Sequence, residues 1–193
     1  MGNKTIPTKA EIIRELRQRL DADRFAHSLR AEKIAVALAR HYKVSANKAS
    51  LAALLHDYAR QYNSAQLLQQ AKKFGLKIDG FSRAEPKLLH AELGAILVRR
   101  DFHVQARDLL AAIKWHTLGA VGMGRLAKII YLADHLEEGR GYPGLGQLRR
   151  LAFRDLDRAV GAAADRTIRY LLRQDLPIHP GSLRTRNYYL FKL

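Results

Sequence analysis

The sequence contains no cysteine, and this absence restricts the chemistry open to the protein. A disulfide framework, a thiolate metal site and a cysteine nucleophile are excluded, and the absence fits a reducing compartment. Any metal ion must therefore bind histidine, aspartate or glutamate. Long apolar runs are also missing: residues 51–55 are typical and fall far short of the roughly 18 residues that span a bilayer. With no apolar signal-peptide core near its start, the chain is expected to be cytoplasmic and free of membranes.

Acidic residues are few, and the resulting positive charge raises the question of an anionic partner. Of 193 residues, 34 are lysine or arginine and 18 are aspartate or glutamate, so the formal net charge is +16. Such a charge favours nucleic acid, nucleotides or an anionic surface without choosing among them. A solvated basic surface explains it equally well. The lysine and arginine residues are spread over nearly every predicted helix rather than gathered in one stripe with aromatic residues. This distribution is compatible with weak nucleic-acid binding only.

Strand-like alternation is scarce, while apolar residues recur with helical spacing, as at Ile12, Leu16 and Leu20. The same period predicts helices over roughly 8–20, 24–41, 45–56, 64–74, 87–100, 105–115, 125–136 and 155–172. Ser45 and Ser64 are candidate N-caps, and Gly75 is a candidate helix stop. Residues 77–86, 139–146 and 177–180 are predicted to be loops because they are rich in glycine or proline. We predict an all-α fold with a single domain over residues 1–193.

Eight histidines provide the metal-binding capacity that cysteine would otherwise supply. His41, His103 and His135 are interpreted as ordinary packing or helix-end residues. Four other histidines and two aspartates lie beside apolar helical positions, where a lone carboxylate would cost several kcal/mol. This candidate ligand set comprises His27, His56, Asp57, His90, His116 and Asp134.

Each member of this set has an ordinary structural explanation when taken singly, but the whole set is hard to explain in that way. Four imidazoles and two carboxylates suit one or two cations such as iron, manganese, zinc or magnesium. If Asp57 bridges two metal ions, the pair could clamp the attacking and leaving oxygens of a phosphoryl transfer.

These residues also carry a resemblance to known proteins. The pattern His27, His56-Asp57 and Asp134 resembles the HD-domain metal-dependent phosphohydrolase superfamily, and His90 with His116 matches its two-metal branch. The strings LAALLHDYAR, AIKWHTLGAVGM, LAKIIYLADHLEEGRGYPG and LPIHPGSLRTRN are similar to the bacterial HD-domain symmetrical bis(5'-nucleosyl)-tetraphosphatase family. The similarity covers about residues 24–187 and implies an HD-domain helical bundle with a metal site in its core. The strong positive charge departs from the family pattern.

The resemblance further implies an activity and its cofactors. Family members hydrolyse diadenosine tetraphosphate to two ADP with metal-activated water, and their two-metal site contains iron. Two divalent or mixed-valence ions are therefore expected here, with manganese or zinc as alternatives to iron. By resemblance the first metal is held by His27, His56, Asp57 and Asp134, and the second by Asp57, His90 and His116. The residues implied to be catalytic are His56, Asp57 and Asp134.

The polyphosphate substrate needs positive partners, and arginine suits it because its planar fork binds phosphate oxygens in pairs. Arg24 and Arg140 are the candidate phosphate-binding arginines, and Lys128 is a weaker candidate for the same role. Thr117 either donates to phosphate or caps a turn, and the cap is slightly favoured. The candidate nucleotide-binding residues are Arg24, His27, Asp57, His90, His116, Thr117, Asp134, Arg140, Pro177, Ile178, His179, Pro180 and Ser182.

Two other functions stay open from the sequence. One is an HD-domain hydrolase of another nucleotide or an alarmone. The other is a basic RNA-binding or ribosome-associated module that keeps the HD fold for its shape. A homodimer also stays open, because one sequence cannot divide its apolar faces between core and interface.

Overall fold

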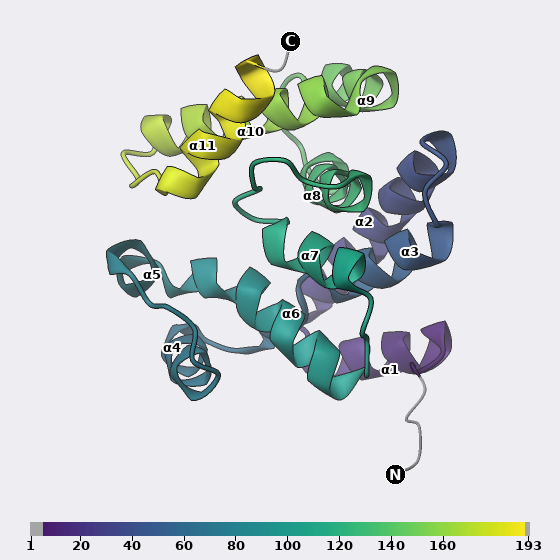
Figure 1. Ribbon diagram of the computed structural model, residues 1–193, viewed down its shortest axis with the longest axis vertical. Helices are drawn as coiled ribbons and strands as arrows, with labels where there is room; N and C mark the ends of the chain where they lie inside the picture. The colour runs from purple at the N-terminus through teal and green to yellow at the C-terminus, as the bar shows by residue number, and fades with distance from the viewer. Residues whose placement is uncertain (1–5, 192–193) are drawn as a thin grey trace.

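The computed structural model describes residues 6–191, which form helices without any strand (Figure 1). The all-α prediction is confirmed for this part of the chain. The α-helices are α1 Lys9–Arg19, α2 Ala22–His41, α3 Ala46–Leu55, α4 Ser64–Lys73, α5 Gly80–Ala84, α6 His90–Asp101, α7 Arg107–Trp115, α8 Arg125–Leu136, α9 Leu145–Arg154, α10 Leu156–Arg173 and α11 Pro180–Phe191. Two short 3-10 helices are η1 Tyr58–Gln61 and η2 Pro86–Leu89.

The centre of the molecule is formed by α2, α3, α7 and α8. Helix α2 packs against α3 and α8, while α7 packs against α3, α6 and α8. Ala35, Ala52 and Ala133 are fully buried on these helices. Small side chains at a helix contact permit a short distance between the helix axes. The helices that carry the candidate ligands therefore lie close together.

Helices α9, α10 and α11 lie together at one end of the molecule, and α4 and α5 lie at a separate corner (Figure 1). Helix α11 packs along α10. Thr185 of α11 also donates a hydrogen bond of 2.9 Å to the carbonyl oxygen of Leu118, in the loop after α7. The amide of Met123 donates to the hydroxyl of Tyr189 at 2.9 Å. The C-terminal helix is thus fixed beside the loop that follows α7.

Local capping explains where several helices begin. The side chain of Ser45 accepts a hydrogen bond from the amide of Lys48, which confirms its predicted role as the N-cap of α3. Asn63 caps α4 in a reciprocal capping box with Gln66, so the prediction of Ser64 as that cap is wrong by one residue. Gly75 follows the end of α4 with a φ of +69°, as expected of a helix stop.

Three predicted loops or tails contain helices that the sequence reasoning missed. Helix α5 lies within the predicted loop 77–86, and Asp79 caps it by accepting a hydrogen bond from the amide of Ser82. Helix α9 follows the glycine-rich segment and begins after Gly144, whose φ is +83°. The predicted loop 177–180 leads directly into α11. Within residues 6–191, no helix is both long enough and apolar enough to cross a membrane.

Candidate metal centre

The six predicted ligands converge from five segments of the chain. They come from α2, from the end of α3, from the start of α6, from the end of α7 and from α8. Two triads, His27–His56–Asp57 and Asp57–His90–His116, each have ligand atoms within 4.8 Å of one another. Asp57 belongs to both triads and is only 3% exposed. The structure therefore brings together the residues that the sequence pattern grouped.

The first half of the cluster is centred on His27. Its Nε2 lies 3.1 Å from Nε2 of His56 and 3.1 Å from Oδ1 of Asp134. Oδ2 of Asp57 lies 3.8 Å from Nε2 of His27 and 3.7 Å from Nε2 of His56. Two imidazoles and two carboxylates thus surround one small volume.

The second half uses the other oxygen of Asp57. Its Oδ1 lies 3.2 Å from Nε2 of His90 and 3.6 Å from Nε2 of His116. The hydroxyl oxygen of Thr117 lies 3.2 Å from Nε2 of His90 and 3.1 Å from Nε2 of His116. Each oxygen of Asp57 therefore faces a different pair of histidines.

Helix ends orient three of the four histidines. Nδ1 of His56 donates to the carbonyl oxygen of Ala53 at 2.6 Å, and Nδ1 of His116 donates to that of Ile113 at 2.7 Å. Nδ1 of His90 likewise donates to the carbonyl oxygen three residues earlier, at the end of η2. The last carbonyl groups of a helix lack partners within the helix, so they are free to accept these bonds. Each ring is left with its Nε2 lone pair directed at the cluster.

These donor roles leave lone pairs facing one another. Nε2 of His90 and Nε2 of His116 are only 2.9 Å apart, and the Thr117 hydroxyl can donate its proton to only one of them. The Nε2 atoms of His27 and His56 form a second close pair. Such pairs are stable only with a proton or cation between them. Neutral imidazoles beside carboxylates suit borderline divalent metals, so these residues fit two metal ions.

The charge balance of the cluster agrees with this fit. Burial lowers the pKa of His56 to about 4 and also lowers that of His90, so both rings are neutral. Burial acts against a charge on His27 as well, but Asp134 and Asp57 outweigh it and raise the pKa of His27. Burial would raise the pKa of Asp57, yet the surrounding imidazoles, His56 foremost, hold it well below its usual value. The cluster is therefore anionic and attracts positive charge.

Two arginines flank the first half of the cluster. Nη1 of Arg24 lies 3.1 Å from Oδ2 of Asp57, and Nη2 of Arg140 lies 2.6 Å from Oδ1 of Asp134. Their side chains are 35% and 39% exposed. Both guanidinium groups thus reach the cluster while remaining accessible to a ligand from solvent. Lys128 instead pairs with Asp157 and lies over the ring of Tyr189, so it does not join them.

Glu137 also belongs to this region, although the sequence reasoning did not single it out. It directly follows α8 and is 2% exposed. Its Oε1 lies 3.3 Å from Nδ1 of His27, and its Oε2 lies 2.5 Å from Nε of Arg30. Glu137 stands in the string EEGR, three residues before the predicted Arg140, but no local pattern distinguishes it from the exposed Glu138 beside it.

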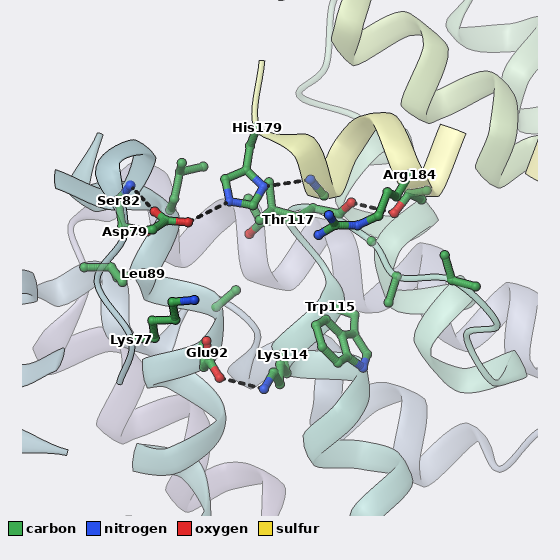
Figure 2. A pocket seen from close by; sticks show the side chains of 18 residues that line it. Lys77, Asp79, Ser82, Leu89, Glu92, Lys114, Trp115, Thr117, His179 and Arg184 are labelled. Carbon is green, nitrogen blue, oxygen red and sulfur yellow. Dashed lines mark hydrogen bonds and ion pairs between the residues drawn. The ribbon is translucent and has the colours of Figure 1, made fainter. Parts of the chain in front are cut away.

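A pocket of about 420 Å³ adjoins the second half of the cluster and is lined by Thr117 (Figure 2). Lys114 in this pocket pairs with Glu92 at 2.6 Å and lies 4.8 Å from the centre of the Trp115 ring. His179 of the 177–180 segment reaches into the same pocket. The pocket thus offers apolar, aromatic and charged surface next to the metal ligands.

The other predicted residues of the 177–182 segment are placed differently. Nε2 of His179 lies 3.6 Å from Oδ2 of Asp79, and both residues line the first pocket as well as a second hollow lined by Pro177 and Pro180. Ile178 and Ser182 line neither pocket. Of this predicted set, His179 is the residue that lines the pocket beside Thr117.

Comparison with known proteins defines the class to which this fold and cluster belong. The family model described as the HD domain matches residues 24–139. The chain therefore belongs to the HD domain family, and all six candidate ligands fall within the matched region.

Particular relatives extend the match over almost the whole chain. A Bacillus subtilis protein named bis(5'-nucleosyl)-tetraphosphatase, symmetrical, is 33% identical, over 93% of this chain and 96% of its own length. A Halalkalibacterium halodurans protein of the same name is 34% identical, over 95% of this chain and 98% of its own length. A Clostridium acetobutylicum crystal structure, described as a predicted HD superfamily hydrolase involved in NAD metabolism, is 31% identical with a TM-score of 0.93. That match covers 97% of this chain and all of the other.

Proposed function

We propose that this protein is a metal-dependent phosphohydrolase that cleaves diadenosine tetraphosphate symmetrically into two ADP. The observation that carries the proposal is the pair of ligand triads that share Asp57. The names of the B. subtilis and H. halodurans relatives support the substrate and the symmetry of cleavage. In the reaction, water attacks one central phosphorus and the central bridging oxygen leaves with the other half, so both products are diphosphates.

We assign the two metal positions as the family resemblance divides them. Asp134 completes the triad of His27, His56 and Asp57, while His90 and His116 hold the second ion with Asp57. Cations bound there would supply charge stabilisation for phosphate oxygens and activation of the attacking water. The metal we propose is iron, as the family resemblance implies, and elemental analysis of anaerobically purified protein distinguishes it from manganese and zinc.

The chain's own residues would bind and orient the polyphosphate. Arg24 and Arg140 are exposed enough to turn from the carboxylates toward phosphate oxygens, which they can bind in a bidentate manner. On the opposite side, the pocket beside Thr117 is large enough to take one nucleoside, with His179 in its wall. We therefore propose that the phosphate chain runs across the cluster from this pocket toward the arginines.

Product analysis tests the proposed reaction. Metal-loaded protein incubated with diadenosine tetraphosphate in ¹⁸O-water should release ADP alone, with one labelled oxygen for each pair of ADP molecules. ATP with AMP, or no product, would contradict the proposal. Faster turnover of another nucleotide or of a guanosine alarmone would favour a different HD-domain hydrolase.

The net charge of +16 motivates one alternative from another class, a basic RNA-binding module. RNA binding by such a module would weaken steeply with salt and would survive substitution of the cluster. Binding of this kind by His56→Ala, together with no hydrolysis by the parent protein, would favour the alternative. The proposed hydrolase predicts the opposite pattern, with hydrolysis by the parent and its loss in the variant.

A further inference from the structure

We propose that Glu137 is a positioning residue for the metal centre. Its carboxylate holds the imidazole of His27 in the orientation and tautomer that direct Nε2 at the first metal position. This inference rests on the proposed metal-dependent function. It assigns a role to a buried side chain that belongs to neither of the two triads.

His27 differs from the other three histidines in its place along the chain. His56 and His116 follow helix ends and His90 follows η2, so each finds a carbonyl oxygen three residues earlier. His27 lies inside α2, where carbonyl groups accept the amide hydrogens of the helix itself. Its Nδ1 therefore needs an acceptor from another element, and Oε1 of Glu137, at 3.3 Å, is in that position.

The carboxylate of Glu137 is itself held firmly in place. Its Oε2 accepts hydrogen bonds from Nε of Arg30 at 2.5 Å and from the amide of Gly139 at 2.6 Å. Nε of Arg140 lies 3.5 Å from Oε1. A Cβ at position 139 would lie 2.5 Å from Nη2 of Arg30, so the glycine leaves room for the guanidinium. The acceptor is thus fixed by its neighbours independently of His27.

The hydrogen-bond donors around Glu137 explain why a carboxylate is needed at this position. Both oxygens of Glu137 only accept, so Nδ1 of His27 must carry the proton and Nε2 keeps its lone pair. A glutamine would place its oxygen against the two donors Arg30 and Gly139, which leaves its NH₂ group facing Nδ1. His27 would then have to accept at Nδ1 and carry its proton on Nε2, where it could not bind a metal. A carboxylate partner also raises the basicity of a ligand imidazole.

The test compares Glu137→Gln with a matched control, Glu32→Gln. Glu32 lies on α2 itself, where its mostly buried side chain pairs with Lys9 at 2.7 Å and accepts a hydrogen bond from Ser50 at 2.6 Å. Each variant loses one carboxylate and its closest ion pair, with Arg30 in Glu137→Gln and with Lys9 in Glu32→Gln. We expect isothermal titration calorimetry with manganese to show two binding events in the parent protein. In Glu137→Gln the affinity of one of them should fall by about 10–100-fold. In Glu32→Gln both binding events should keep their parental affinity. In Glu137→Gln the other binding event should keep its parental affinity.

Kinetics and a second variant complete the experiment. In Glu137→Gln, kcat should fall by a larger factor than KM for diadenosine tetraphosphate rises. The pocket and Arg24 do not depend on Glu137, and Arg140 keeps its bond to Asp134 when it loses the contact with Oε1 of Glu137. If circular dichroism shows that Glu137→Gln does not fold, Glu137→Asp is titrated instead. The aspartate keeps the charge but withdraws the oxygens by one methylene, so it should still weaken one binding event.

Two outcomes separate this inference from the function on which it rests. Two binding events of parental affinity in the folded Glu137 variant would overturn the positioning role and leave the hydrolase intact. A parent protein that binds no manganese or iron would instead overturn the proposed metal-dependent function.

Discussion

At the scale of single residues, Asp57 has a position that no other ligand shares. It directly follows His56 after the end of α3, in a turn with φ of −97° and ψ of 15° before η1. This turn directs Oδ2 toward His27 and His56, and Oδ1 toward His90 and His116. One buried carboxylate therefore connects both halves of the proposed metal centre.

The first prediction concerns loss of this connection. We expect Asp57→Asn to lower kcat/KM by at least about a hundredfold, because metal ions supply several kcal/mol of transition-state stabilisation and about 1.36 kcal/mol corresponds to a tenfold rate. His90→Ala removes a ligand of the second metal alone and should be less damaging. Steady-state kinetics with metal content measured for each variant provides the test. Equal and mild losses in both variants would indicate a single-metal site.

The scale of the element explains which parts of the site the sequence could predict. The ligand set was identified from histidines and aspartates beside apolar helical positions and from the HD-domain resemblance, and apolar periodicity also predicts where α3 and α7 stop. Glu137 was missed because its function depends on α2 and α8 meeting, which no local pattern encodes. Helix α11 was missed because Pro180 suggests a loop, although proline is well tolerated at the first position of a helix.

Helix α11 and the loop after α7 allow a prediction at this same scale. Gly119 has a φ of +68°, and a Cβ there would overlap the Cγ2 atom of Thr185 and lie 2.8 Å from its Oγ1. We expect Gly119→Ala to displace α11 from the pocket, raise KM for diadenosine tetraphosphate severalfold and leave the metal content unchanged. The left-handed backbone alone should cost roughly 1–2 kcal/mol of unfolding free energy. Kinetics and thermal melting measure both effects.

Gly122→Ala provides the control for this substitution. Gly122 has nearly the same φ, +67°, but a Cβ there would meet only the hydroxyl of Tyr188 at 3.9 Å. It should lose similar stability through its backbone and keep its KM. If Gly119→Ala and Gly122→Ala raise KM equally, the close approach of Thr185 does not maintain the pocket.

At the scale of the whole molecule, the proposed metal ions would connect segments that are distant in the chain. The ligands extend from His27 to Asp134 and lie on helices that form the centre of the fold. Without cations, the facing lone pairs of the close Nε2 atoms and the negative charges of the buried carboxylates are not fully compensated. Metal binding should therefore stabilise the native state against the unfolded chain, in which these ligands are far apart.

Chelation tests this coupling. At a metal concentration of 100 Kd, a single site contributes about 2.7 kcal/mol to the free energy of unfolding. For a chain of this size each site is then worth roughly 5–10 °C in Tm, so we expect removal of both metals to lower Tm by roughly 10–20 °C and to abolish hydrolysis. Differential scanning fluorimetry before and after chelation, with metal added back, measures the shift. Unchanged activity and Tm would show that the ligand assignment is wrong.

The net charge of +16 belongs to this scale too, and the structure accounts for part of it. Arg24 and Arg140 lie at the cluster, and Arg30 holds Glu137. These roles depend on contacts between helices, so the composition could indicate an anionic ligand but not which arginines would meet it. The single domain expected over residues 1–193 and the nucleotide-binding roles stay predictions.

The order of the site along the chain has a consequence for its biosynthesis. All six candidate ligands precede residue 135, whereas His179 and Thr185 of the pocket wall come later. About 45 residues separate Asp134 from His179, so at roughly 5–20 residues per second the ribosome adds the wall a few seconds after the last ligand. The proposed ligands are therefore all synthesised before the residues that complete the proposed nucleoside pocket.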